Sequence, residues 1–139
     1  MEGTKKRELP RPNNIRMVEP NEEIDFFKWW CIICLKPFIN LTNREMDVLA
    51  AFLRKRWELS KKISDPAILD TMSMSEDVKN KVLEECNITL QHFYVIMSTL
   101  KKKGVIINNA INPKYIPNIR SDSKYFVLQI WFKDDTILK

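Results

Sequence analysis

Glycine, histidine and cysteine are scarce in this chain, whose 139 residues include two glycines, one histidine and three cysteines. Loops that cradle phosphates need several closely spaced glycines, and the sequence has no such loop. His92 has no nucleophile or paired carboxylates at a spacing that would support acid–base chemistry. We therefore expect a protein that is not an enzyme and that uses no cofactor.

The cysteines offer one metal-like spacing, Cys31-x-x-Cys34, with Cys86 far along the chain. A structural zinc site needs four ligands, usually two such pairs or one pair with two histidines. The single pair lies in an apolar aromatic run, so core packing is the favoured interpretation. A metal or redox enzyme using these cysteines or His92 is the lesser alternative. Three cysteines without an export signal predict reduced thiols in a cytoplasm.

Long apolar runs are also missing. No stretch reaches the ~18 apolar residues of a membrane span, and residues 1–14 lack the apolar core of a signal peptide. The expected location is the cytoplasm, or a host cytoplasm or virion for a phage-encoded protein, with no membrane partner. A net charge of +5 favours a negatively charged partner without identifying it.

The composition divides the chain into an arm and one domain. Residues 1–20 are polar and proline-containing, with a basic cluster at Lys5, Lys6 and Arg7, and are expected to form a disordered arm when alone. Residues 21–139 are expected to form the folded domain. Its predicted parts are an accessory helix at 21–36, a first core helix at 42–59, a helix-turn-helix at 76–103 and a wing at 105–133.

The accessory helix has polar ends and an aromatic centre. Asn21 is its predicted N-cap, two glutamates follow in the first turn, and Pro37 ends it. The run 29–35 is also apolar enough for a buried strand, an alternative that periodicity does not decide, although a helix is favoured. Its aromatic residues need cover, either from the rest of this domain or from a second copy, and exposed patches of this kind usually mark interfaces. A protein partner or a homo-oligomer is expected to form through this helix and the N-terminal arm. The predicted face is Phe26, Phe27, Trp30, Ile33 and Cys34.

The helix at 42–59 has the clearest signals, because Thr42 and Glu45 form a capping box. Asp65-Pro66 and Ser75 predict the starts of two shorter helices that follow. The inward stripe of the first helix is predicted to be Met46, Leu49, Ala50, Leu53 and Trp57. Its outer side is predicted to be basic, through Arg44, Arg54, Lys55 and Arg56, with Lys61 and Lys62 beyond.

The stretch 79–107 has the predicted order helix, tight turn, helix and strand. Asn87-Ile88-Thr89 interrupts the first helix, and the Thr89 hydroxyl can cap the second. Three consecutive lysines suit the last turn of that helix, and Gly104 is placed to end it. Apolar spacing predicts that the buried side of the second helix is Phe93, Ile96, Met97 and Leu100.

A wing is predicted after this helix. Asn108-Asn109 indicates a turn, and residues 125–132 are rich in β-branched and aromatic residues that favour a second strand. The long loop between the two strands contains proline and carries Lys114, Arg120 and Lys124.

This pattern resembles the winged helix-turn-helix family. The resemblance covers roughly residues 41–133 and is carried by Ile88 in the turn, Thr89 at the N-cap, the apolar stripe and the Leu-Lys-Lys-Lys-Gly-Val-Ile exit. It implies a mainly α fold with a small β wing, here with an extra N-terminal helix and an extended arm. It also implies that the second helix lies in the major groove of double-stranded DNA.

The resemblance places the binding face on the outside of that second helix. By analogy, Gln91 pairs with adenine and Val95 touches a thymine methyl group, while basic side chains of the helix end and the wing meet phosphates. The implied DNA-binding or docking face is Thr89, Gln91, His92, Val95, Ser98, Thr99, Lys101, Lys102, Lys103, Lys114, Arg120 and Lys124.

Two functions fit this face. The first is DNA binding by a small regulator or DNA-associated protein of a bacterium or phage, as a dimer through the aromatic helix. The second is a non-enzymatic assembly component of a phage particle or other large complex, which uses the same fold to dock onto protein. Net charge and the lysines favour the first. The outer face lacks arginine, and Tyr94 and Val95 make its centre apolar, which favours the second.

Overall fold

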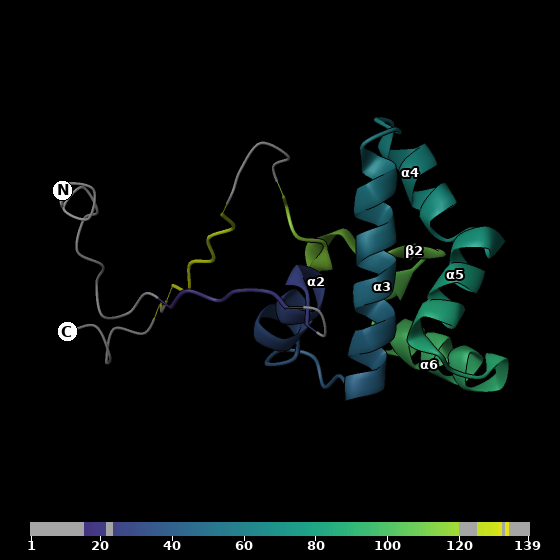
Figure 1. The fold of residues 1–139 in the computed structure, drawn as a ribbon, viewed down its shortest axis with the longest axis horizontal. Coiled ribbons are helices and arrows are strands. Elements are labelled where there is room, and N and C mark those ends of the chain that lie inside the picture. The colour runs from purple at the N-terminus through teal and green to yellow at the C-terminus, as the bar shows by residue number, and fades with distance from the viewer. Residues whose placement is uncertain (1–15, 22–23, 120–124, 132, 134–139) are drawn as a thin grey trace.

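The computed structural model of the chain describes residues 16–21, 24–119, 125–131 and 133 (Figure 1). The protein is mainly helical, with a small two-stranded antiparallel sheet. The element order is α2 (Phe26–Trp30), the π-helix η1 (Cys31–Leu35), α3 (Asn43–Ser60), α4 (Pro66–Ser73), α5 (Glu76–Cys86), α6 (Leu90–Lys102), β1 (Ile106–Ile107), β2 (Ala110–Ile111) and the 3₁₀ turn η2 (Pro113–Tyr115).

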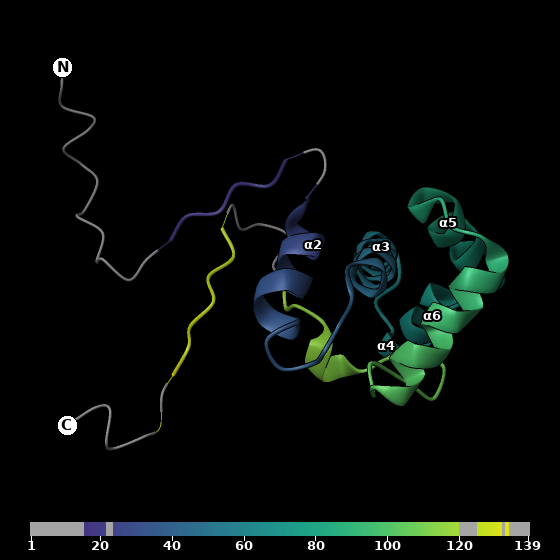
Figure 2. The same cartoon turned by 90° about the horizontal axis from the view of Figure 1, so that it is seen from below.

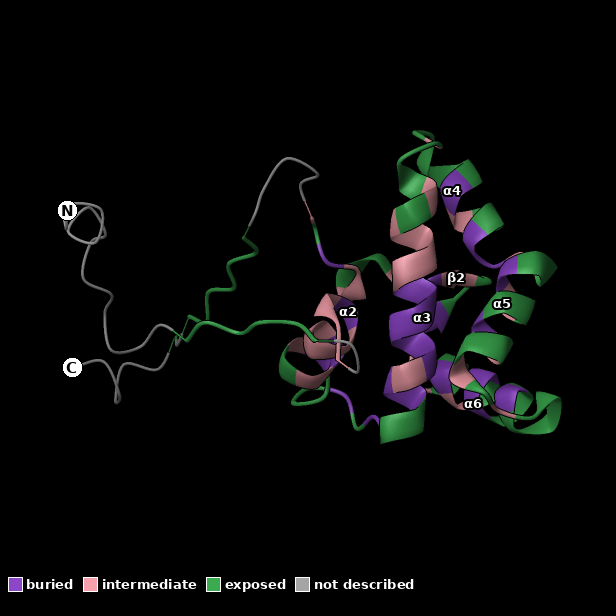
Figure 3. Cartoon of the chain, viewed as in Figure 1, coloured by how far each residue is buried: buried purple, intermediate pink, exposed green. Residues whose placement is uncertain are grey.

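Helix α3 lies at the centre of the fold, with α2 on one side and α5 and α6 on the other (Figure 2). Its middle is buried on all sides, as expected for a helix that other helices surround (Figure 3). The predicted stripe is buried as far as Leu53, and Trp57 packs against the core while partly exposed. Val48, Ala51 and Phe52 are buried as well, because α3 contacts α2, α4, α5 and α6 and is covered on more than the predicted side.

Side-chain caps begin three helices where the sequence predicts them. At α3, the Thr42 hydroxyl accepts from the Glu45 amide at 3.2 Å, and Glu45 Oε1 accepts from the Thr42 amide at 3.0 Å. Asp65 caps α4, with Pro66 in its first turn, and Ser75 caps α5. The predicted capping box and both helix starts are confirmed.

Replacement of Thr42 by alanine is expected to lower the free energy of unfolding by about 1 kcal/mol. The substitution removes the acceptor for the Glu45 amide at the start of the central helix. Urea denaturation measures the change, and Thr42→Ser is the matched control because it keeps the hydroxyl. A serine variant as unstable as the alanine variant would assign the effect to the lost methyl group.

The accessory helix begins later than predicted. Asp25 caps α2, because its carboxylate accepts from the Lys28 amide at 3.0 Å. Asn21, the predicted cap, accepts instead from the Ile24 amide at 2.7 Å, in a turn that precedes the helix. The prediction that Asn21 is the N-cap is therefore wrong, since a closer acceptor stands at Asp25.

Residues 29–35 are helical, which confirms the favoured interpretation and excludes a strand. The wider π-helical turn of η1 changes which side chains face inward. Phe27, Cys31 and Leu35 are buried, and Phe26 and Trp30 pack against the core. Ile33 was predicted to share a face with these aromatic residues, but it is 41 % exposed.

The β1–β2 hairpin is far shorter than the predicted wing. Asn108 and Asn109 have φ angles of 52° and 57°, the left-handed conformation that a type I′ hairpin turn requires. The chain therefore reverses at once and pairs Ile106 with Ile111 and Ile107 with Ala110. The prediction that residues 125–132 form the second strand is wrong, because the described residues 125–131 form no strand. Closing a two-residue loop costs less chain entropy than closing a long one.

Residues 16–21 and 125–131 both leave the helical body on the side of α2 (Figures 1 and 2). Residues 16–20 of the predicted arm are exposed, whereas its basic cluster Lys5, Lys6 and Arg7 lies outside the described residues. Within the described ranges, no helix has the length and apolar character that crossing a bilayer needs.

Candidate functional site: the exposed face of helix α6

The turn between α5 and α6 is fixed by two local signals. Asn87 ends α5 in the left-handed conformation, with a φ of 52°. Thr89 begins α6, because its hydroxyl accepts from the His92 amide at 3.1 Å. Only Ile88 separates them, and it packs partly buried against the core. The predicted helix–turn–helix geometry therefore follows from these three residues.

The far end of α6 closes in a Schellman turn. Gly104 has a φ of +77°, and a Cβ added there would meet nothing within 4 Å. Glycine is thus needed for the backbone angle and not for space. The Val105 amide donates to the Leu100 carbonyl at 3.0 Å, and the Gly104 amide donates to the Lys101 carbonyl at 3.1 Å.

The inward side of α6 is the predicted one. Phe93, Ile96, Met97 and Leu100 are all buried. The Phe93 ring lies 6.2 Å from the Phe52 ring of α3, measured between centroids. This packing fixes the rotation of the helix and therefore which side chains point away from the protein.

The opposite side of α6 is open. Its centre is apolar, because Leu90, Tyr94 and Val95 are 54 %, 61 % and 58 % exposed. The sequence interpretation missed Leu90, although its spacing of four residues from Tyr94 signals a shared face. We call the exposed residues of this helix the α6 face: Leu90, Gln91, His92, Tyr94, Val95, Ser98, Lys101 and Lys102.

Two predicted members of the site are engaged within the helix. The hydroxyl of half-buried Thr99 donates to the Val95 carbonyl one turn earlier, at 3.0 Å. Thr89 is exposed, but its hydroxyl is occupied as the helix cap. Both residues therefore shape the edge of the α6 face and do not extend its polar surface.

Lys103 is drawn away from the α6 face. Its ammonium group lies 2.6 Å from Glu45 Oε1 of α3 and also donates to the Asn40 carbonyl. Burial on its own raises the pKa of the Glu45 carboxyl, but the bonds from Lys103 and Thr42 outweigh it and hold that pKa below its usual range. Lys103 thus joins α6 to α3, contrary to the prediction that it contacts phosphate.

The predicted basic wing is not assembled as expected. The β1–β2 hairpin carries no cation along its length. Lys114 is exposed beside it on η2, with its ammonium group 5.3 Å from the Tyr115 ring centroid. Arg120 and Lys124 lie outside the described residues.

The basic side predicted for α3 is largely neutralised by neighbouring helices. Arg54 binds Asp25 at the start of α2 at 2.6 Å and also binds Glu85 of α5. Arg56 binds Asp70 of α4 at 2.8 Å. These ion pairs fasten three helices to the central one, so the prediction of an open basic side is wrong.

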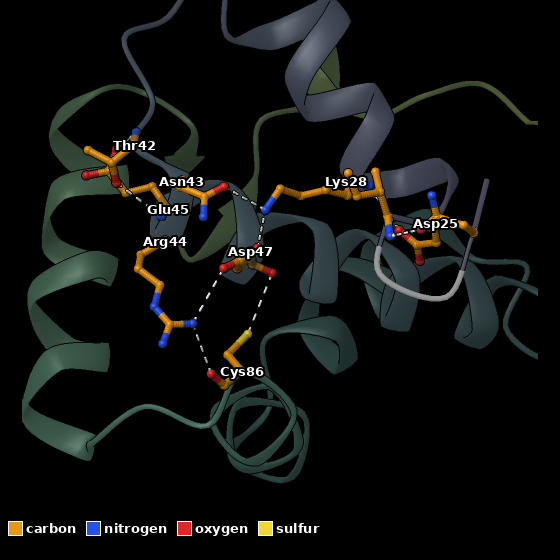
Figure 4. Close-up of polar contacts among 10 residues, drawn as sticks. Asp25, Lys28, Thr42, Asn43, Arg44, Glu45, Asp47 and Cys86 are labelled. Carbon is orange, nitrogen blue, oxygen red and sulfur yellow. Dashed lines mark hydrogen bonds and ion pairs between the residues drawn. The ribbon is translucent and has the colours of Figure 1, made fainter. Parts of the chain in front are cut away.

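Figure 4 shows a second set of such links. Lys28 of α2 reaches Asp47 of α3 and donates to Asn43 Oδ1 at 3.0 Å. Arg44 lies 3.5 Å from the same Asp47 carboxylate and donates to the Cys86 carbonyl at 3.3 Å. The lysine pair of the α6 face is free of ion pairs among the described residues, so it is the more accessible source of positive charge.

Cys31 is buried in the core and Cys86 packs against it, whereas Cys34 is half-buried. Burial raises the pKa of the Cys31 thiol to about 12 and that of Cys86 to about 11, and it also raises the pKa of Cys34. Protonated thiols are poor nucleophiles and poor metal ligands at neutral pH. Among the residues that the structure describes, no three side chains of histidine, cysteine, aspartate or glutamate are grouped to hold a metal ion.

An open pocket of about 350 Å³ lies between α3 and the chain after β2. Its lining includes Phe27, Trp57 and Ile116, and no residue of α6. Among the described residues that line it, Arg56 is the only titratable one, and Asp70 pairs with that charge. These lining residues therefore offer no pair of groups for acid–base chemistry.

Comparison with known proteins gives no further guide to the site, because no protein-family model, curated protein or solved structure matches the chain. Its function must be argued from the α6 face alone.

Proposed function

We propose that this chain is a non-enzymatic DNA-binding protein of the winged helix-turn-helix type, a small regulator or DNA-associated protein that acts in the cytoplasm. The supporting observation is the open side of α6, the second helix of a helix–turn–helix with a three-residue turn. A helix in this position of the motif enters the major groove.

The α6 face has the groups that such a contact needs. Gln91 can pair with an adenine through two hydrogen bonds, and Val95 can contact a thymine methyl group. Lys101 and Lys102 stand at the end of the helix, where they would meet the phosphate backbone. Since only these two lysines of the α6 face serve this role, we expect modest affinity for DNA. Each lysine should add about one unit to the slope of the logarithm of the binding constant against the logarithm of the salt concentration.

The lysine pair provides the test. Replacing Lys101 and Lys102 together by glutamine is expected to weaken duplex binding about tenfold, because two exposed charge contacts contribute roughly 0.7 kcal/mol each. The salt slope should fall by about two units. Fluorescence anisotropy of a mixed-sequence duplex, titrated at several salt concentrations, measures both quantities.

Lys61 and Lys62 give the matched control, since their replacement by glutamine removes the same charge. They lie at the other end of the fold, beyond the end of α3, where Lys61 stacks 3.9 Å from the Trp57 ring centroid. This control should keep its affinity within twofold. An equal loss in both double variants would mean that net charge, and not the α6 face, attracts the DNA.

One observation favours a second function. Leu90, Tyr94 and Val95 place an apolar strip at the centre of the α6 face. Such a strip also suits the groove of a protein partner, as in an assembly component of a phage particle or other large complex. If the wild-type protein does not bind DNA even at low salt, docking onto a protein partner becomes the proposed function.

A further inference from the structure

The segment of residues 125–131 exposes a large apolar surface. Tyr125, Val127, Ile130 and Trp131 are 69 %, 77 %, 70 % and 85 % exposed. The segment contains no charge and is rich in the β-branched and aromatic residues that favour strands. Apolar surface of this extent on a folded protein marks an interaction site.

The segment is anchored to the protein at one point. The Phe126 ring packs edge-on against Phe26 and Trp30 of α2, with centroid distances of 5.1 and 5.6 Å. Phe126 and Leu128 are only 37 % and 44 % exposed, less than the residue before or between them. Over residues 125–128 the exposed fractions alternate as in an extended chain with one side turned toward a surface, and Ile130 lies beyond this contact.

Within the part of the chain that the structure describes, no backbone hydrogen bond involves residues 126–131. An extended apolar chain with unpaired amides and carbonyls is a template for another strand. What it pairs with must be uncharged and of similar apolar character.

We propose that the 125–131 segments of two copies of this chain pair as antiparallel strands about a twofold axis at Leu128. In this register Leu128 of one chain lies directly opposite Leu128 of the other chain. The cross-strand pairs are Tyr125 with Trp131, Phe126 with Ile130, and Val127 with Gln129. Aromatic–aromatic and aromatic–β-branched pairs are favourable across antiparallel strands, and no like charges oppose one another.

The segment is thus complementary to itself, which is what a twofold interface requires. An isolated two-stranded ribbon is only marginally stable in water. Here Phe126 of each copy holds the ribbon against the aromatic side of α2, which supplies the missing support. The dimer does not depend on DNA binding, because none of the seven residues belongs to the α6 face.

Disulfide trapping in the full chain tests the register. On the twofold axis, opposite Cβ atoms lie about 4.5–5.5 Å apart, close enough to oxidise after a small shift. Leu128→Cys should therefore form a covalent dimer under mild oxidation. Val127→Cys is the matched control, because its side chain points to the other side and faces Gln129. Wild-type protein measures any background from Cys31, Cys34 and Cys86.

Charge at position 128 tests the dimer itself. Leu128→Lys should raise the dimer dissociation constant about tenfold, because two like charges meet on the axis. Leu128→Glu should do the same alone, and mixing the two variants should restore a dimer. Gln129→Lys is the control, since it faces Val127 and should change the constant less than threefold. Light scattering after size-exclusion chromatography measures each species.

Three results would overturn the pairing. They are a wild-type monomer at the highest soluble concentration, equal cross-linking at positions 127 and 128, and no recovery when the lysine and glutamate variants are mixed. The first result would mean that any strand pairing with this segment comes from a different protein.

Discussion

Phe93→Ala is expected to lower the free energy of unfolding by about 3–5 kcal/mol. The Phe93 side chain is 2 % exposed and lies against Phe52, so its removal leaves a cavity between α6 and α3. A domain of this size is stabilised by only about 5–15 kcal/mol in total. Thermal and urea denaturation should show a large loss, with the melting temperature falling by roughly 10 °C.

The next residue supplies the control. Tyr94→Ala removes a ring of similar size from the same helix, but Tyr94 is 61 % exposed. Its stability should stay within about 0.5 kcal/mol of wild type. A comparable loss of stability in both variants would contradict the observed rotation of α6. It would also contradict the assignment of residues to the α6 face, which depends on that rotation.

Much of the helical part of this fold follows from signals a few residues apart. Thr42 and Glu45 cap α3, and Thr89 and Gly104 bound α6, each through contacts with near neighbours in sequence. Helical spacing then fixed the buried side of α6 without knowledge of its neighbours. Such local rules succeed because caps and glycine turns act over one helical turn.

Contacts between distant residues could not be predicted in this way. Arg54 finds Asp25 and Glu85, which are 29 and 31 residues away, and Lys103 finds Glu45 at a separation of 58. Nothing in the local pattern distinguishes these cations from free ones. The prediction from the sequence therefore included too many basic side chains in the exposed surface, both on α3 and at the end of α6.

The β1–β2 hairpin shows that strand propensity is misleading when pairing is not considered. Residues 125–132 have a stronger strand composition than Ala110 and Ile111, yet the Asn108-Asn109 turn brings the latter pair into register. Strand preference depends on an available partner more than on residue type. Among the described residues, 126–131 form no backbone hydrogen bond, which is why we assign this segment a partner in a second copy.

Lys103→Met is expected to lower the free energy of unfolding by about 3 kcal/mol at pH 7, the lower end for breaking a buried ion pair. Glu45 keeps 9 % of its side-chain surface exposed and Lys103 keeps 24 %, so removing the ammonium group leaves a carboxylate with little access to water. Urea denaturation at pH 4–7 measures the effect. Lys102→Met removes the same charge from an exposed position and should change stability by less than about 0.5 kcal/mol.

The contribution of the Glu45–Lys103 contact to stability depends on pH in a definite direction. The pKa of Glu45 in the folded protein lies below its usual 4.5, because the bonds from Lys103 and Thr42 outweigh the opposing effect of burial. The contact therefore stabilises the fold above that pH, and its contribution is lost as the pH falls through the lower, folded-state pKa. In Lys103→Met the unpaired Glu45 should bind a proton more readily, so the gap between variant and wild type should narrow below about pH 5. A small difference in the free energy of unfolding that does not change with pH would mean that Lys103 does not pair with Glu45. Lys103 would then count again as a candidate phosphate contact.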